Sequence, residues 1–175
     1  MTLLVTPAVA FSDFILAVHI LAVVIGFGAT FAYPLIFAAT RKADPKVVPW
    51  LWSVIQRIDR YVVNPGLLVV VLAGIYLASD EHRWSAFFVQ WGIGVAIVIG
   101  AVVGSFMIPR EGKLAKLAAR DLEAAGVGAS GAATADDVAW SEEYLAMSRQ
   151  VAIGGAILDL LVVITVFVMA AHAGA

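Results

Sequence analysis

The chain has 175 residues, of which 62% are hydrophobic and only 14% are charged, with a formal net charge of -2. This apolar share exceeds the roughly 45–50% of soluble domains, so the surplus apolar side chains are expected to face lipid. The chain contains no cysteine, which excludes disulfides, thiolate catalysis and Cys-ligated clusters. It has no basic arm of the kind that binds nucleic acid, so we expect the lipid bilayer and no nucleic acid as a partner.

Four segments reach the length of about 20 apolar residues that a membrane-spanning helix needs. They cover residues 13–38, 61–79, 85–108 and 150–171. The first segment lacks a positively charged start and is longer than a signal-peptide core, so we interpret it as a retained span. The sequence therefore predicts an all-α integral membrane protein, a single domain over residues 1–175, built as an up-down bundle of four transmembrane helices.

The Lys and Arg residues are concentrated in two of the three connections. Ten of the eleven lie within residues 39–60 and 109–149, and Arg83 alone lies between the second and third spans. Because cations accumulate on the cytoplasmic side of a membrane, these two connections are predicted to face the cytoplasm. Both termini would then lie outside, in a bacterial inner membrane.

The first and third connections both show helical patterns. Residues 47–61, which contain Trp50 and Trp52, form either an interfacial helix with a bend at residues 64–66 or one long helix with the second span. The cytoplasmic connection at residues 109–149 begins with an amphipathic stretch whose charges are expected to form a solvated face. A Gly/Ala/Ser-rich stretch, residues 125–137, is expected to be a flexible tip before the chain re-enters a helix.

One face of the first span differs from the others. At helical spacing this face carries mostly small and polar side chains: His19, Val23, Gly26, Thr30 and Tyr33. The remaining faces consist of Ile, Leu, Val and Phe. This face is expected to pack on the other helices.

The third span carries small residues every four positions, which allow another backbone to approach closely. These residues are Gly92, Ala96, Gly100 and Gly104. They predict either packing inside the bundle or a face for a homo-oligomer.

Asp159 lies about ten residues from the cytoplasmic end of the fourth span, near the middle of the membrane. An ionisable group at that depth is costly and usually faces the bundle interior. We expect Asp159 to face inward, with Ala152 and Gly155 on the same side. It is our candidate catalytic residue, either as a proton carrier or as a group that orients a ligand; the alternative is a neutral carboxyl that only links helices.

His19 lies within the membrane near its outer boundary, and it is our first candidate for binding a cofactor. It could be an axial haem ligand, a metal ligand or a proton relay; the alternative is a neutral imidazole bonded to a neighbouring helix. His82 and His172 fall on the same outer side, which suggests a metal site formed by three imidazoles. Depth along the helices places His19 and Asp159 about 10 Å apart, too far for direct contact.

Arg57, Asp59 and Arg60 lie at the cytoplasmic mouth of the second span. They predict either an interface anchor with one ion pair or a site for an anionic group, such as a lipid phosphate or a haem propionate. Arg60 is the candidate cofactor-binding residue of this group.

Two stretches resemble a family of bacterial integral membrane proteins, the domain-of-unknown-function family 2269. They are LAVHILAVVIGFGATFAYPL and RIDRYVVNPGLLVVVLAGIYL, and the matching positions are His19, Gly26, Gly28, Asp59, Arg60, Tyr61, Pro65, Gly66 and Gly74. More distantly, the first span is similar to that of HemJ-type protoporphyrinogen oxidases and copper-resistance D-type proteins. The resemblance implies a small helical bundle that uses the first-helix histidine, His19, with haem b as the cofactor of the oxidases.

These observations predict a haem- or metal-associated membrane redox protein in which His19 is the ligand. The alternative is a proton-coupled or small-solute transporter or channel with Asp159 and His19 along its path. A third hypothesis is an accessory membrane subunit without chemistry of its own.

Overall fold

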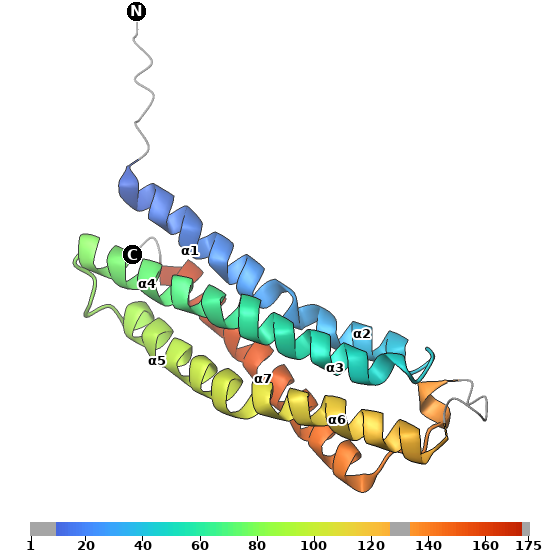
Figure 1. The fold of residues 1–175 in the computed structure, drawn as a ribbon. Helices are drawn as coiled ribbons and strands as arrows, with labels where there is room; N and C mark the ends of the chain where they lie inside the picture. The colour runs from blue at the N-terminus through green and yellow to red at the C-terminus, as the bar shows by residue number, and fades with distance from the viewer. Residues whose placement is uncertain (1–9, 127–133, 173–175) are drawn as a thin grey trace, which may run out of the picture.

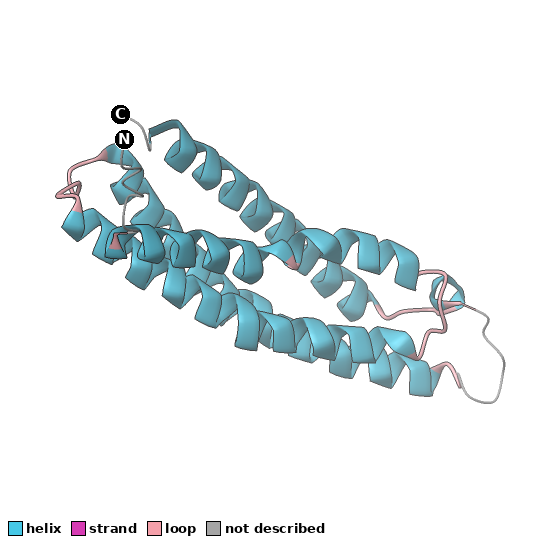
Figure 2. Cartoon of the chain, turned by 90° about the horizontal axis from the view of Figure 1, so that it is seen from above, coloured by secondary structure: helices cyan, strands magenta, loops and turns pink. Residues whose placement is uncertain are grey.

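The computed structural model describes residues 10–126 and 134–172. Much of the expected flexible tip, residues 127–133, therefore lies outside the described residues. The described parts consist of helices joined by short turns, without strands (Figure 2). In order, the elements are α1 (Phe11–Gly28), η1 (Thr30–Ala32), α2 (Tyr33–Thr40), α3 (Val47–Ile58), η2 (Asp59–Val63), α4 (Asn64–Asp80), α5 (Phe87–Val102), η3 (Val103–Met107), α6 (Ile108–Ala124), η4 (Ala135–Asp137) and α7 (Glu142–His172).

These elements join into four helices that are long and apolar enough to cross a membrane: Phe11–Thr40, Val47–Asp80, Phe87–Ala124 and Glu142–His172. They run alternately up and down (Figure 1). The α2–α3 and α6–α7 connections lie at one end of the bundle, which we call the connection end. The start of α1, the α4–α5 turn and the end of α7 lie at the other, the terminal end. The predicted all-α fold with four helices able to span a membrane is confirmed.

The second and third helices extend beyond the predicted spans. Residues 47–60 continue directly into α4, and residues 108–124 continue directly from α5 through η3. Of the two alternatives for the first connection, one long helix is therefore correct. The predicted connection at residues 109–149 is helical over most of its described length.

Three prolines explain where these helices become irregular. Pro34 comes two residues after the 3₁₀ turn η1, and Pro65 and Pro109 come two residues after the π-helical turns η2 and η3. A proline has no N–H and its ring crowds the carbonyl four residues earlier, so the preceding turn tightens or widens instead of remaining α-helical. The helix then continues, with a break in its regular bonding.

The first and second helices approach most closely at two glycines. A Cβ added to Gly66 of α4 would lie 3.0 Å from the Cα of Gly26 in α1. The small and polar face of the first span lies along this contact: the His19 ring bonds to α4, while Thr30 and Tyr33 bond to α7 and η2. The prediction that this face packs on other helices is confirmed.

The small residues of α5 serve packing inside the bundle at two positions. A Cβ on Gly92 would clash with Met169 of α7, and one on Gly100 would lie 3.2 Å from Leu67 of α4. At Gly104 a Cβ would meet no atom within 4 Å. A homo-oligomer through the open part of this face remains a prediction.

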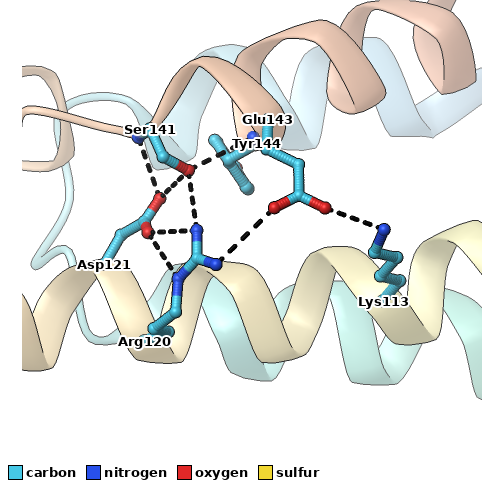
Figure 3. A network of polar contacts seen from close by, with 6 residues as sticks. All are labelled: Lys113, Arg120, Asp121, Ser141, Glu143 and Tyr144. Atoms are coloured by element: carbon cyan, nitrogen blue, oxygen red, sulfur yellow. Dashed lines mark hydrogen bonds and ion pairs between the residues drawn. The ribbon is translucent and has the colours of Figure 1, made fainter.

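A serine caps α7 and ties it to α6 (Figure 3). The Ser141 hydroxyl accepts a bond from the backbone N–H of Tyr144 at 3.3 Å, as an N-cap residue does. The same hydroxyl and the Ser141 backbone N–H donate to Asp121 of α6 at 2.7 and 2.9 Å. The start of α7 is thereby held against α6.

The expected solvated face of α6 is only partly correct. Lys113 and Arg120 are exposed and pair with Glu143 at 2.8 and 3.6 Å. Asp121 and Glu111, however, are only 7% and 1% exposed. Both lie on the side of α6 that packs into the bundle, so the charges of this helix do not share one environment.

Candidate functional site: an acid-lined cavity

A cavity of about 700 Å³ lies inside the bundle, between its middle and its connection end. All four helices contribute to its wall, through residues in the ranges 27–41, 52–63, 99–111 and 144–162. The exposed lining residues Ala38 on α2 and Ala152 and Ala156 on α7 show that the cavity opens sideways between these two helices. The first and fourth helices contact each other at η1, where Thr30 bonds to Asp159.

The cavity is closed toward the terminal end by apolar side chains. Five of its lining residues belong to one tightly packed core cluster: Phe27, Val63, Ile99, Val103 and Val162. A second cluster around Trp52 and Leu114 packs α3, α6 and the start of α7 at the connection end. The cavity therefore lies between two apolar core clusters and has mainly apolar walls.

Asp159 faces this cavity from α7, together with Gly155 and Ala152. The expected inward orientation of Asp159 is confirmed. Its Oδ1 lies 2.6 Å from the hydroxyl of Thr30, which also lies 2.8 Å from the backbone carbonyl of Phe27. A hydroxyl has one proton to donate and can accept as well. Thr30 can therefore donate a hydrogen bond to a charged Asp159, or donate one to the Phe27 carbonyl while it accepts one from a neutral Asp159.

A second polar group lies across the cavity. The Tyr33 hydroxyl donates to Oδ1 of Asp59 at 2.9 Å, and Asp59 is only 4% exposed. The carboxyl groups of Asp59 and Glu111 also lie close enough to each other to interact. Two ionised carboxylates have no proton to donate, so a hydrogen bond between this pair forms only when one of the two groups is protonated.

Glu111 is the least satisfied polar group of the cavity. Its Oε2 is buried and has no hydrogen-bond partner among the described residues. Leaving a buried polar atom unpaired costs about 1–3 kcal/mol. Glu111 lines the cavity although Oε2 itself is buried, so a ligand that brings a donor can reach this atom once the side chain turns toward the cavity.

Glu111 was not among the residues predicted from the sequence, although its position in the pattern contains a signal. Leu114 and Ala118 follow at spacings of three and seven, so Glu111 lies on the apolar side of its helix. Asp59 likewise follows Trp52 and Ile55 on the apolar side of α3. A carboxyl at an apolar position of an amphipathic helix therefore indicates a buried acid that sequence alone could have identified.

His19 lies outside this cavity and between α1 and α4. Its Nδ1 lies 2.9 Å from the carbonyl of Val70, and its Cε1 lies 3.4 Å from where a Cβ of Gly74 would be. The bond to a carbonyl places the proton on Nδ1 and leaves Nε2 with a free lone pair. His19 and Asp159 have different partners, as the predicted depth difference implies.

The other two histidines are exposed at the terminal end. His82 lies in the α4–α5 turn with Nδ1 3.2 Å from the carbonyl of Asp80. His172 ends α7, where its Nδ1 lies 2.8 Å from the carbonyl of Val168 and its ring packs near Phe88. In the described part of the chain, no three His, Asp or Glu side chains come together as a metal site would need.

The arginines of the second helix lie on its outer surface. Arg57 and Arg60 are exposed, whereas Asp59 between them points into the bundle. Within residues 10–126 and 134–172 neither arginine makes an ion pair. Asp59 therefore belongs to the cavity rather than to a surface anchor, and a role of Arg60 toward an anionic group remains a prediction.

Comparison with known proteins adds nothing to this picture, because no family model, curated protein or solved structure matches the chain.

Proposed function

We propose that this chain is an integral membrane protein that moves a small solute through the cavity in a proton-coupled manner. The observation that carries the proposal is a cavity of about 700 Å³ lined by three carboxyl groups, Asp59, Glu111 and Asp159, inside helices apolar enough to span a membrane. Ionisable groups at such depth are expensive to insert, and they mark substrate and proton pathways.

The arrangement of the carboxyl groups supports proton coupling. Asp59 and Glu111 lie close enough to share a proton, and Thr30 can bond to Asp159 in either protonation state. Proton uptake or release at these positions needs only local rearrangement of hydrogen bonds. The polar groups can therefore change charge when a solute enters or leaves.

The irregular turns support a change in access to the cavity. Both π-helical turns supply cavity residues, Asp59 and Val63 from η2 and Val103 and Met107 from η3. Helices bend most readily where their regular bonding is broken. Bending at these turns would open the apolar cluster that closes the cavity toward the terminal end.

Proteoliposomes loaded with the pH dye pyranine test the proposal. With an outside-acid gradient and the potential clamped by valinomycin, we expect proton entry above that of empty liposomes, measured alone and with a mixture of small amines, amino acids, sugars and carboxylic acids. Asp159→Asn and Glu111→Gln should each lose most of this flux. Asp80→Asn and Glu123→Gln change exposed carboxyls away from the cavity and should behave as wild type.

The proposal fails if wild-type protein gives no proton movement above empty liposomes under any of these conditions. It also fails if both cavity variants retain the wild-type rate.

The membrane is proposed to be the bacterial cytoplasmic membrane, with both termini outside. The distribution of charge supports this orientation, since the connection-end helices carry all Lys and Arg residues except Arg83 in the α4–α5 turn.

A second candidate function, a haem-binding redox protein, rests on His19. Its Nδ1 bond to the Val70 carbonyl fixes the ring and leaves Nε2 as an acceptor, which is the usual state of a metal-ligating histidine. His82, His172 or a methionine would have to supply any second ligand, and Arg60 is the candidate for a propionate. An absorption spectrum of purified protein before and after dithionite tests this: a Soret band lost in His19→Ala would support it, and a featureless spectrum with ample haem would exclude it.

A further inference from the structure

We infer that the ligand of the cavity is a small monovalent organic cation, an amine or guanidine with N–H donors on an apolar body, which binds at Glu111 and Asp59. This inference rests on the proposed function, since it names the class of solute that the same cavity takes.

The need for an N–H donor comes from Glu111. Its side chain is only 1% exposed, and Oε2 has no partner among the described residues. Asp59 accepts one bond from Tyr33 at 2.9 Å, and an ionised carboxylate has room for further donors. A guanidinium or ammonium group presents several N–H donors to such a pair, whereas a quaternary ammonium or a carboxylate presents none.

The need for positive charge comes from the absence, among the described residues, of an ion pair between a Lys or Arg and the carboxyls of the cavity. Within the described residues, every Lys or Arg ion pair involves other acids, and none involves Asp59, Glu111 or Asp159. Arg41 and Arg149 line the cavity, but both are exposed residues, and Arg41 pairs with Asp136 at 3.0 Å. The buried carboxyls are therefore not neutralised by the chain's own cations.

The apolar body follows from the walls. Aromatic and aliphatic side chains line the same cavity as the carboxyls, among them Phe27, Phe37 and Trp52. The small residues Ala38, Ala152 and Ala156 line the lateral opening between α2 and α7, which faces the hydrocarbon if the bundle spans a membrane. An amphiphilic cation can enter there with its apolar part first or last.

Binding is coupled to the proton held by the carboxyl pair. When the cation places its N–H donors at Asp59 and Glu111, the shared proton leaves the pair and passes to water. The charge inside the cavity stays the same, because one positive charge replaces another. This exchange would make transport of the cation an antiport with a proton.

Equilibrium dialysis with protein in nanodiscs, corrected with empty nanodiscs, tests the inference. The probe is labelled benzylguanidine, which keeps its charge at all accessible pH values. Benzyltrimethylammonium has the same charge and a similar body without N–H donors, and 3-phenylpropionate has the opposite charge. We expect saturable binding of benzylguanidine, at least about tenfold tighter than either comparator, with release of a proton in weakly buffered solution.

Glu111→Gln should weaken binding at least about tenfold, because it removes a charge-assisted hydrogen bond. Glu123→Gln, an exposed glutamate of the same helix, should bind as wild type. Ala156→Phe fills the lateral opening at an exposed position and should also weaken binding, which keeps the test decisive where Glu111→Gln does not fold.

Equal binding of the three probes, preference for the anion, or binding without proton release would each overturn the inference. Proton flux in liposomes without benzylguanidine binding would overturn only the assigned ligand. Benzylguanidine binding without any flux would overturn the transport proposal and leave the ligand assignment standing.

Discussion

Each of the three carboxyl groups in the cavity is held in a different way. Asp159 contacts the Thr30 hydroxyl, and Asp59 accepts a hydrogen bond from the Tyr33 hydroxyl. Glu111 lies next to Asp59, and its Oε2 has no hydrogen-bond partner among the described residues. In an apolar interior the cost of an unpaired polar atom is high. The differences between these three environments therefore determine which group can exchange a partner for a ligand.

The contact between Thr30 and Asp159 should contribute to stability. Thr30→Val keeps the shape of the side chain but leaves Asp159 without its hydroxyl partner, so we expect a loss of about 1–3 kcal/mol. Thermal unfolding in detergent would show a lower Tm for this variant. Thr40→Val is the matched control, since the Thr40 hydroxyl bonds only to the Ile36 carbonyl of its own helix. An equal Tm for the two variants would contradict the assigned role of the contact.

At the scale of the elements, prolines and glycines decide how the helices meet. Pro65 and Pro109 each follow a π-helical turn that supplies residues to the cavity. Gly26 and Gly66 bring α1 and α4 together, next to the turn that carries Asp59. Close approach at the glycines and bending at the prolines thus place the polar groups of different helices around one space.

Gly66→Leu should disrupt this arrangement. The Cβ alone would lie 3.0 Å from the Gly26 backbone, and a backbone cannot move aside as a flexible side chain can. We expect a destabilisation of at least about 1–3 kcal/mol, or failure to fold. Gly94→Leu is the control, because nothing lies within 4 Å of a Cβ there. Fluorescence-monitored thermal unfolding distinguishes them, and a Gly66→Leu protein as stable as Gly94→Leu would refute the close contact.

At the scale of the whole molecule, the two ends of the bundle differ in structure and charge. The connection end holds long helical extensions with most of the basic residues, and a serine-capped α7 fixed to α6. The terminal end holds a short turn and an apolar core. With such unequal ends, we expect the bundle to take one orientation in a membrane.

Single-cysteine labelling tests that orientation, and the absence of native cysteine makes it direct. In intact cells a membrane-impermeant maleimide should label Asp80→Cys, at the terminal end, and should not label Lys42→Cys until the membrane is permeabilised. Both positions are exposed, so access to them depends on the side of the membrane. The reverse labelling pattern would place the termini in the cytoplasm.

Length and hydropathy were sufficient to predict the helical class, the four apolar helices and the inward face of the first one, because these depend on local composition and period. The inward position of Asp159 was also predictable, because a carboxyl in an apolar helix is costly to expose to lipid and usually faces the other helices.

The tertiary structure alone brought Asp59, Glu111 and Asp159 to one cavity. These residues come from three different helices, and the periodicity of one helix cannot show which helix faces it. The charges of the connection that contains Glu111 were expected to form a solvated face, and packing of α6 against α3 buries Glu111 instead. The sequence by itself determined the helical class and the inward face of the first helix, because these depend on local composition and period. The packing of helices distant along the chain determined which polar side chains meet.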